Sequence, residues 1–410
     1  MKGVPKELQY VTLNKVLSRM PKPSSLIFTN LFDSVEYPSD QIRWLLEYGT
    51  AGISPFVAPG APSPVMGDDG MFGEGSAACA YWKEKVFLEE VMLNNMKDPM
   101  NPTVRQTARR QLARKQKRLK NRSMRRREWM LAKAFFDHKI NYQREGGVKF
   151  TVDYGVPDSH QVTLTGDDVW NDGTGSPGAT ATPIRDIYDM KKEFVDDVGV
   201  NPTDFFINSE LLTTLLFNTD LQDLLKKSNF GDGDLFARPA QVLGNLLGLG
   251  SLTIYDDLFE LGAWMTQDVA SGSTDIHIDD ATDFEAGARV RLFDLTKYRT
   301  WEDYVIDSVD ILNNTITLTS AVSKKYTAGR CRVVMRKKLI NDTTVGMFAR
   351  SVDDEKIAEF MEAPFGLGRH FGLYADTKEE WDPDGIWMRV QNKGLPVIYH
   401  PEALYTLTVG

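Results

Sequence analysis

The sequence predicts an α+β protein that carries a small all-β segment, and three observations support this fold class. One helical pattern starts at Pro102 and meets no further proline and no glycine until Gly146. The segments on either side of it alternate apolar and polar residues, as half-buried strands do. Between residues 267 and 336, short alternating runs separated by turn signals replace the mixed pattern. Strands and helices that follow one another in this way indicate helices packed on a sheet.

Length and composition predict a folded protein of two or three domains. The chain has 410 residues, of which 42% are hydrophobic, and this is enough to bury a sizeable core. Its two cysteines, Cys79 and Cys331, form neither a CxxC pair nor a disulfide framework. No apolar run approaches the roughly 18 residues of a membrane span, and no signal pattern is present. We therefore expect buried thiols, no membrane association and folding in the cytoplasm.

Residues 1–47 are predicted to form an arm. The segment is too short for a core of its own, and Pro21, Pro23 and Pro38 interrupt it. Its one apolar cluster must therefore be buried against other structure. We expect this segment to reach across the surface of another element.

Residues 48–92 are predicted to form a long extended hairpin. Glycine and proline are so dense between Gly52 and Gly75 that helix and central strand are excluded. The flanks at 54–58 and 81–88 alternate as strands do. Loops of this length are usually either functional or disordered.

The predicted helix, about residues 102–145, carries an unusual charge. Between Arg105 and Arg127 it holds twelve Lys and Arg residues and no acid, whereas the rest of the chain has 36 basic and 57 acidic residues. The charge fits a solvated face, contact with the acidic surface of a neighbouring copy, or contact with nucleic-acid phosphates. The stretch lacks aromatic residues and any zinc or helix-turn-helix motif, which argues against a sequence-specific reader. The candidate contact residues are Arg105, Arg109, Arg110, Arg114, Lys115, Arg118, Arg122, Arg125, Arg126 and Arg127.

The remainder of the chain is predicted to be a mixed body interrupted by the all-β segment. Residues 183–266 combine helical patterns with short buried strands. The runs between 267 and 336 predict a small all-β module, and the mixed pattern resumes at about 337. The pattern therefore indicates an insertion. Its predicted interior consists of Ile276, Ile278, Phe284, Val290, Leu292, Val305, Ile316 and Leu318.

The motifs of common enzyme classes are missing from the sequence. There is no Gly-Lys dipeptide, and hence no phosphate loop, and no GxSxG, HExxH or CxxC pattern. The run GEGSAA at Gly73 has the spacing of a dinucleotide fingerprint but does not follow a buried strand. Adjacent acids such as Asp279 and Asp280 point to opposite faces of a strand and cannot share a substrate. We expect no catalytic, cofactor-binding or metal-binding residues.

Six segments carry a resemblance to a known family. They are "SSLIFTNLFDSVEYPSDQI" before the long hairpin, "YGTAGISPFVAPG" and "KVFLEEVMLNN" on its two sides, "VKFTVDYGVP" after the long helix, and the late segments "KKLINDTTVGMFAR" and "GLPVIYHPEALYTLTVG". These segments resemble those of tailed-bacteriophage major capsid proteins of the lambda E type. The order of arm, hairpin, long helix, strand and mixed body is similar to that of the capsid fold. The all-β segment and the high arginine content of the helix depart from the family pattern.

The resemblance implies the organisation of the tailed-phage major capsid fold, which has an arm, an extended loop, a spine helix, and peripheral and axial domains. The implied assignments are 1–47 for the arm, 48–92 for the extended loop, 93–182 for the peripheral domain with its spine helix, 183–266 and 337–375 for the axial domain, 267–336 for the inserted all-β domain, and 376–410 for the closing strands of the peripheral domain.

The resemblance also implies a function, that of a major capsid protein and not of an enzyme. Such a chain self-assembles as hexamers and pentamers into an icosahedral head shell around double-stranded DNA, in the host bacterial cytoplasm. Its partners would be other copies, a separate scaffolding protein, a portal and a decoration protein. The alternatives are a nucleic-acid-binding packaging or nucleoid-type protein that uses residues 105–127, and a cytoplasmic hydrolase. The implied intersubunit contacts are the basic residues above, Leu26, Phe28, Leu31 and Phe32 in the arm, and Phe56, Val57, Met66, Met71 and Phe72 in the extended loop.

Overall fold

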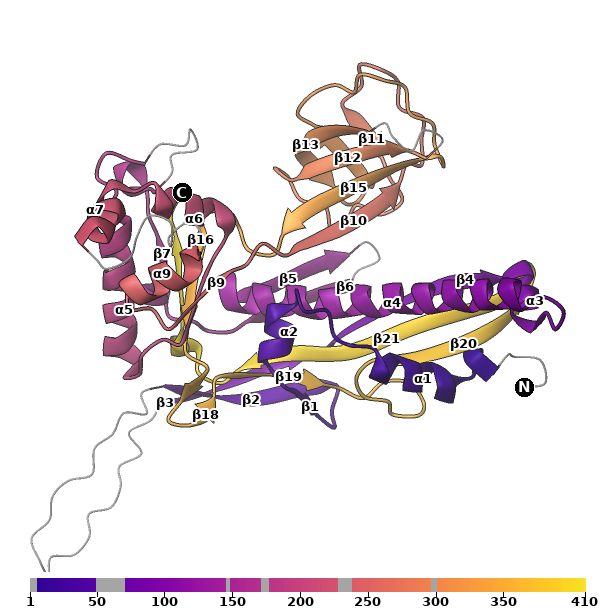
Figure 1. The fold of residues 1–410 in the computed structure, drawn as a ribbon, viewed down its shortest axis with the longest axis horizontal. Helices are drawn as coiled ribbons and strands as arrows, with labels where there is room; N and C mark the ends of the chain where they lie inside the picture. Colours follow the sequence, from indigo (N-terminus) through magenta and orange to yellow (C-terminus); the bar gives the residue numbers. More distant parts are fainter. Residues whose placement is uncertain (1–5, 49–70, 145–147, 171–176, 228–237, 296–300) are drawn as a thin grey trace, which may run out of the picture. The chain divides into compact units, whose positions relative to one another are not determined.

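The chain divides into two compact units. A computed structural model describes the backbone of residues 6–48, 71–144, 148–170, 177–227, 238–295 and 301–410. The first unit comprises residues 1–138, 153–254 and 343–410, and the second comprises 139–152 and 255–342 (Figure 1). No helix among the described residues is both long and apolar enough to cross a membrane.

Helix α4 is the longest helix of the first unit and spans Pro102–Phe136. The side chain of Asn101 caps its start by accepting a hydrogen bond from the backbone N–H of Val104, at 3.3 Å. Proline in the first turn lacks only an N–H that would have no helical partner. The start predicted from the sequence is therefore confirmed.

The predicted end of this helix, at about residue 145, is wrong. The helix stops at Phe136, and His138 takes a left-handed backbone conformation with φ of 56°. The buried ring of His138 forms a hydrogen bond of 2.8 Å with the hydroxyl of Thr406, a contact that holds it there. Residues Lys139–Arg144 then form strand β5, which suits the β-branched Ile140.

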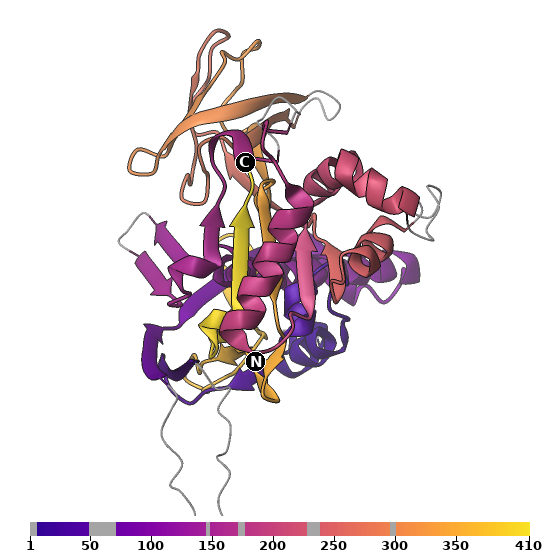
Figure 2. The same cartoon turned by 90° about the vertical axis from the view of Figure 1, so that its left-hand side faces the viewer.

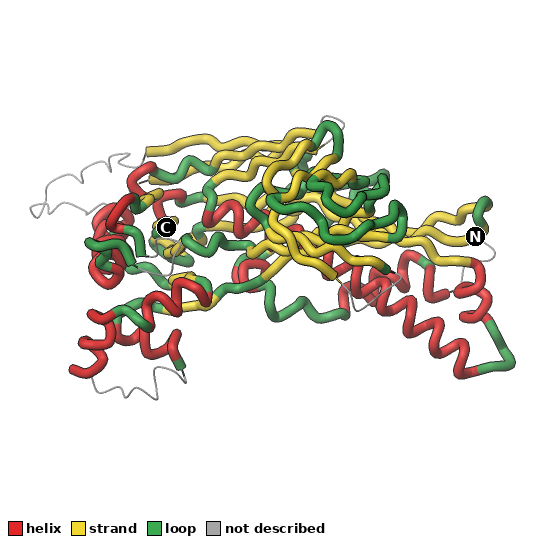
Figure 3. Tube along the Cα trace, turned by 90° about the horizontal axis from the view of Figure 1, so that it is seen from above, coloured by secondary structure: helices red, strands yellow, loops and turns green. Residues whose placement is uncertain are grey.

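A sheet of five strands lies under α4 in the first unit. Strand β21 (Asp384–Ile398) is its longest member and pairs with β4 (Ala80–Glu89), β19 (Ala358–Glu362) and β20 (Tyr374–Trp381), while β1 (Ser34–Glu36) pairs with β19. Helix α4 runs along this sheet (Figures 1 and 3) and packs on β21 and β4. Helices α1 (Tyr10–Arg19) and α3 (Glu90–Lys97) also pack here. The shared apolar core includes Leu13, Leu17, Leu88, Leu93, Met96, Leu112, Leu119, Met388 and Val390.

A second sheet of the first unit has helices beside it. Its order is β7, β22, β16, β8, β9, and helix α5 runs alongside β22 (Figure 2). A Cβ atom at Gly346 would lie only 2.3 Å from the ring of Phe136, so glycine lets the end of α4 pack on this sheet. The strands are β7 (Gln161–Thr163), β8 (Asp204–Ile207), β9 (Ser251–Ile254), β16 (Thr344–Phe348) and β22 (Leu404–Thr408), and the helices are α5 (Pro183–Val198), α6 (Ser209–Leu216), α7 (Thr219–Lys227) and α9 (Pro239–Leu246).

The extended hairpin is built from β2 (Gln41–Tyr48) and β3 (Met71–Ala78), which pair with each other in antiparallel register. The predicted return strand at 81–88 is a strand, but it belongs to β4 and pairs with β21, so its assignment to the hairpin is wrong. The predicted first strand at 54–58 lies outside the described residues. So do three predicted loop contacts, Phe56, Val57 and Met66. For Met71 and Phe72, the structure describes only the backbone pairing.

The second unit contains a six-stranded antiparallel sheet in the order β10, β15, β12, β13, β14, β11. Its predicted interior residues are buried in one apolar cluster, with one exception: Ile306 and not Val305 is buried from β13. The hairpin of β5 and β6 (Val148–Asp153) falls largely in this unit, which the sequence did not indicate. The strands are β10 (Leu258–Trp264), β11 (Asp275–His277), β12 (Arg289–Asp294), β13 (Trp301–Asp310), β14 (Thr315–Leu318) and β15 (Cys331–Lys338). The assignment of residues 267–336 as an inserted domain stays a prediction.

Glu302 gathers a hydrogen-bond network in the second unit. Its carboxylate accepts hydrogen bonds from the hydroxyls of Tyr304 (2.7 Å), Tyr326 (2.8 Å) and Ser323, and pairs with Lys324 at 2.7 Å. Burial alone would raise the pKa of Glu302, but the hydrogen bonds together outweigh it and lower the pKa to about 2.

We expect the network to stabilise the ionised form of Glu302, and hence the fold. A folded-state pKa below the unfolded value contributes stability at neutral pH that is lost as pH falls through the folded pKa. Glu302→Gln should therefore lower the free energy of unfolding at pH 7, and the difference from wild type should shrink as the pH falls from about 4.5 towards 2. Denaturant titrations of the full chain across this range measure the difference. A difference that stays constant with pH would contradict the prediction.

Candidate functional site

Helix α4 carries the candidate site, and the structure divides its basic side chains into buried, internally paired and open groups. Arg127 is buried, with 3% of its surface exposed. Its guanidinium donates to the hydroxyl of Ser34 at 2.5 Å and to the carbonyl of Phe32 at 3.3 Å, and it lies 3.6 Å from the carboxylate of Glu362. It also lies over the ring of Phe360, 4.3 Å from the centroid. The prediction of an intersubunit or phosphate contact at Arg127 is therefore wrong, because its own chain surrounds it.

The pair of Arg127 and Glu362 is strongly desolvated. Burial lowers the pKa of Arg127, and the charge of Glu362 opposes this change. Burial likewise raises the pKa of the Glu362 carboxyl, and Arg127 opposes that rise. An arginine side chain stays protonated in proteins. The pair therefore joins α4 to β19 through a buried cation.

Glu128 attaches the arm to α4. Its carboxylate, which has no exposed surface, accepts hydrogen bonds from the backbone N–H groups of Phe28 (2.9 Å) and Thr29 (2.7 Å). These two residues lie in the first turn of α2 (Ile27–Leu31), where N–H groups have no helical partner. Glu128 was not among the predicted contact residues, although an acid among Met124, Met130 and other apolar residues of a helix is a signal of a buried polar contact.

The apolar cluster of the arm lies within the core of its own chain. Leu26 and Phe28 have no exposed surface, and Phe32 has 6%. The ring centroid of Phe28 lies 5.4 Å from that of Phe135, and the rings of Phe136, Phe206 and Phe348 also surround it. The prediction that Leu26, Phe28 and Phe32 contact neighbouring subunits is therefore wrong. The half-buried Leu31 stays a predicted contact.

Two arginines of α4 form ion pairs with acids of their own chain. Arg109 pairs with Glu7 at 2.7 Å, and Arg122 pairs with Glu84 at 2.7 Å. These pairs are partly exposed and contribute little to stability. They still reduce the charge that each arginine can offer to another molecule.

Two lysines of α4 bind backbone carbonyls. Lys115 donates to the carbonyl of Phe87 at 3.0 Å. Lys120 is buried and donates to the carbonyls of Leu17 (2.8 Å) and Met20 (2.6 Å) at the end of α1. Burial lowers the pKa of Lys120. Both lysines therefore hold neighbouring elements against α4.

The open group lies along one side of the helix, and we call it the basic stripe. Among the described residues, no hydrogen bond or ion pair reaches the side chains of these five exposed cations. At 3.6 residues per turn they fall within an arc of about 100° and extend over about 22 Å. Arg105 lies apart from the basic stripe and is half-buried, and Arg126 stacks on Trp129. Lys117 was not among the predicted contacts. The basic stripe consists of Arg110, Arg114, Lys117, Arg118 and Arg125.

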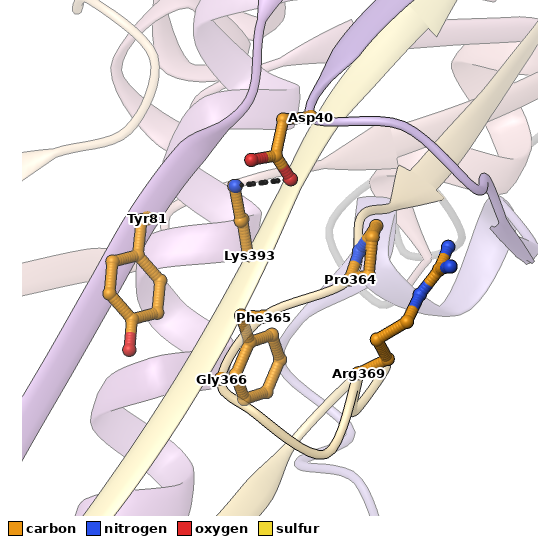
Figure 4. A pocket seen from close by; sticks show the side chains of 7 residues that line it. All are labelled: Asp40, Tyr81, Pro364, Phe365, Gly366, Arg369 and Lys393. Carbon is orange, nitrogen blue, oxygen red and sulfur yellow. Dashed lines mark ion pairs between the residues drawn. The ribbon is translucent and has the colours of Figure 1, made fainter.

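An open pocket lies at the base of the extended hairpin (Figure 4). Lys393 projects into it and pairs with Asp40 at 2.7 Å. The guanidinium of Arg369 donates to the carbonyl of Pro38 at 3.1 Å. No group of three potential metal ligands occurs among the residues that the structure describes. The pocket is lined by Asp40, Tyr81, Pro364, Phe365, Gly366, Arg369 and Lys393.

The fold is similar to that of a solved phage protein. The protein assigned as the capsid protein of a prophage in Escherichia coli CFT073 has a TM-score of 0.55 at 13% identity, over 98% of this chain and 99% of that one. A phage-related protein from Bordetella bronchiseptica RB50 has a TM-score of 0.49 at 11% identity, over 97% and 95% of the chains. A chain of the satellite phage P4 procapsid has 0.43 at 8%, over 99% and 92%. Only the first likeness is high enough to support the fold assignment.

Sequence comparison agrees with the fold. Curated proteins give no match to the sequence. The sequence model of the family described as phage major capsid protein E matches residues 9–260. This range includes α1, the extended hairpin and all of α4, and it is more than half of the 410 residues. The chain therefore belongs to the family of phage major capsid protein E.

Proposed function

We propose that this chain is the shell subunit of a tailed-phage head and assembles as hexamers and pentamers around double-stranded DNA. The observation that carries the proposal is the family match over residues 9–260. The match includes the arm and the long helix, which Glu128 and Arg127 join in one core. Family membership gives no support to a packaging or nucleoid-type protein that uses residues 105–127. The role is structural and not enzymatic.

The extended hairpin supports assembly with other copies. Strands β2 and β3 form a two-stranded sheet, and among the described residues neither strand pairs with a third. Unpaired strand edges present backbone groups that another chain can use. A closed shell of identical chains supplies such a neighbour at every position. We assign Leu31 and the hairpin, with Met71 and Phe72, to contacts of this kind.

The two sheets of the first unit suit the two domains of the capsid fold. We assign the sheet of β1, β19, β21, β20 and β4, together with α4, to the peripheral domain. This assignment differs from the predicted bounds, which put β19 in the axial segment 337–375 and β4 in the extended loop 48–92. The sheet of β7, β22, β16, β8 and β9 is assigned to the axial domain. Strand β22 pairs with β16 and not with β21, so the closing segment 376–410 contributes to both sheets.

The partners that we propose are those of a head-assembly pathway in the host cytoplasm. They are a separate scaffolding protein, a portal and a decoration protein. Within the described residues, the arm packs on α4: the ring of Phe28 contacts Phe135, and Lys120 of α4 donates to the carbonyl of Leu17. This docking supports an arm that belongs to the subunit body, and it favours a scaffold supplied by another chain.

Assembly of the expressed chain tests this proposal. We expect the chain to form uniform shells in the megadalton range when the phage's other head proteins are present, and irregular particles or free capsomers when it is expressed alone. Sedimentation and electron microscopy distinguish these products. A chain that stays monomeric with all head proteins present would contradict the shell function. Uniform shells from the chain alone would contradict only the separate scaffold.

A further inference from the structure

Among the described residues of its own unit, the basic stripe of α4 has no hydrogen-bond or ion-pair partner. Its five cations recur on one helical face, and the sequence from Pro102 to Arg127 contains no acid that could separate them. Like charges one turn apart on a helix repel each other. Other basic residues of α4 do have partners in their own chain: Arg109 and Arg122 pair with acids, and Lys120 donates to backbone carbonyls. An anionic surface of another molecule therefore fits the stripe.

The hairpin tip between β20 and β21 is acidic and carries an exposed aromatic ring, so it is complementary to the basic stripe. Trp381 pairs with Asp384 across the tip and is 87% exposed. Residues two apart on a strand, and residues directly paired on adjacent strands, share a face. Glu379, Trp381 and Asp384 therefore lie on one face, and both carboxylates are exposed. Neither carboxylate has a hydrogen bond or ion pair within the part of the chain that the structure describes.

The ring of Trp381 differs from the rings of three other tryptophans, each of which lies against an arginine guanidinium group. Trp129 has Arg126 over its ring at 5.1 Å from the centroid. Trp301 and Trp264 are similarly covered by guanidinium groups, of Arg291 at 5.0 Å and Arg332 at 5.9 Å. No cation covers Trp381 in the described structure, although it is more exposed than Trp301 and Trp264. A guanidinium group over an indole ring is a favourable contact at exposed sites. An arginine from outside the chain therefore fits this ring.

We propose that the basic stripe of one copy binds the Trp381 tip of a second copy. The inference rests on the proposed shell function. Glu379 and Asp384 form ion pairs with stripe arginines, and a guanidinium covers the indole of Trp381. The contact joins two different surfaces of the same chain, and such contacts close into rings when the rotation between copies permits. Nucleic-acid phosphates would also match the charge of the stripe, but they would leave the tip and its uncovered ring without a role.

A charge-swap experiment tests the contact. A phage that lacks its capsid gene is complemented with Arg114→Glu/Arg118→Glu, with Glu379→Lys/Asp384→Lys, or with all four changes in one chain. Each pair alone places like charges in the contact and should lower the yield of shells at least about tenfold. The four changes together restore opposite charges and should recover most of the yield. Sedimentation of lysates and electron microscopy measure shells, and thermal unfolding of purified subunits shows that each variant is folded.

Two further variants distinguish this contact from a general effect of surface charge. Arg185→Glu/Lys192→Glu on α5 reverses two exposed cations outside the stripe and should leave the yield unchanged. Trp381→Ala should weaken assembly without a charge change. Folded stripe variants that form normal empty shells and lose only packaged DNA would assign the stripe to phosphate contacts and overturn the proposal. The proposal would also be overturned if the chain with all four changes failed to recover the yield of shells. If complementation with the wild-type chain gave no shells, the shell function itself would fail.

Discussion

Arg127→Ala is expected to destabilise the unassembled subunit by about 3–5 kcal/mol, because it leaves Glu362 buried without its cation. The same change removes the donors to Ser34 and to the carbonyl of Phe32. Denaturant unfolding followed by tryptophan fluorescence measures the loss. Arg125→Ala on the exposed side of the same helix is the matched control and should change stability by no more than about 0.5 kcal/mol. Equal losses in the free energy of unfolding for the two substitutions would show that the buried contacts of Arg127 do not stabilise the subunit.

The loss in Arg127→Ala should also depend on pH. Burial raises the pKa of Glu362. The buried carboxylate is therefore costly where it is ionised, at neutral pH, and the cost disappears as the group is protonated when pH falls through the raised pKa. The difference between Arg127→Ala and wild type should consequently be largest near pH 7 and smaller in acid. A difference that grows in acid would contradict the assignment of Glu362 as the partner.

Phe28→Ala should cost about 3–5 kcal/mol, because it removes a fully buried ring from the centre of an aromatic cluster. The rings of Phe135, Phe206 and Phe348 would face the resulting cavity. Phe217→Ala, at a ring that is 65% exposed, is the matched control and should cost far less. Hydrogen exchange adds a local measurement: the N–H groups of residues 28 and 29, which donate to Glu128, should lose protection in Phe28→Ala. Unchanged stability would mean that the arm does not belong to the core.

The long helix shows what local pattern can predict. Its start was predictable because capping by Asn101 and proline in the first turn depend on neighbouring residues. Its end was not, because His138 turns the chain through a contact with Thr406, 268 residues away. The glycine pair at 146–147 was the nearest stop signal in the sequence, and it lies beyond a strand. A helix end set by a distant contact leaves no local signal.

The candidate site likewise depends on both local sequence and distant contacts. Composition located the basic residues within 105–127, and periodicity placed them around the helix. Only the tertiary structure decided which of them are available, because their partners come from other segments: Glu7 for Arg109, Glu84 for Arg122, and the arm for Arg127. If Arg125, Arg126 and Arg127 were replaced together, an assembly defect could not be distinguished from the folding defect that loss of the buried Arg127 would cause.

The sequence by itself determined the fold class, the start of the long helix and the resemblance to phage capsid proteins. The fold class and the family are confirmed by the match to residues 9–260 and by the likeness to the prophage protein. The tertiary structure decided that the arm's apolar cluster joins the core, that β4 pairs with β21, and that five cations of α4 remain open. The reason is physical. Propensity and periodicity act over a few residues, whereas burial and pairing depend on segments that meet only after the chain has folded.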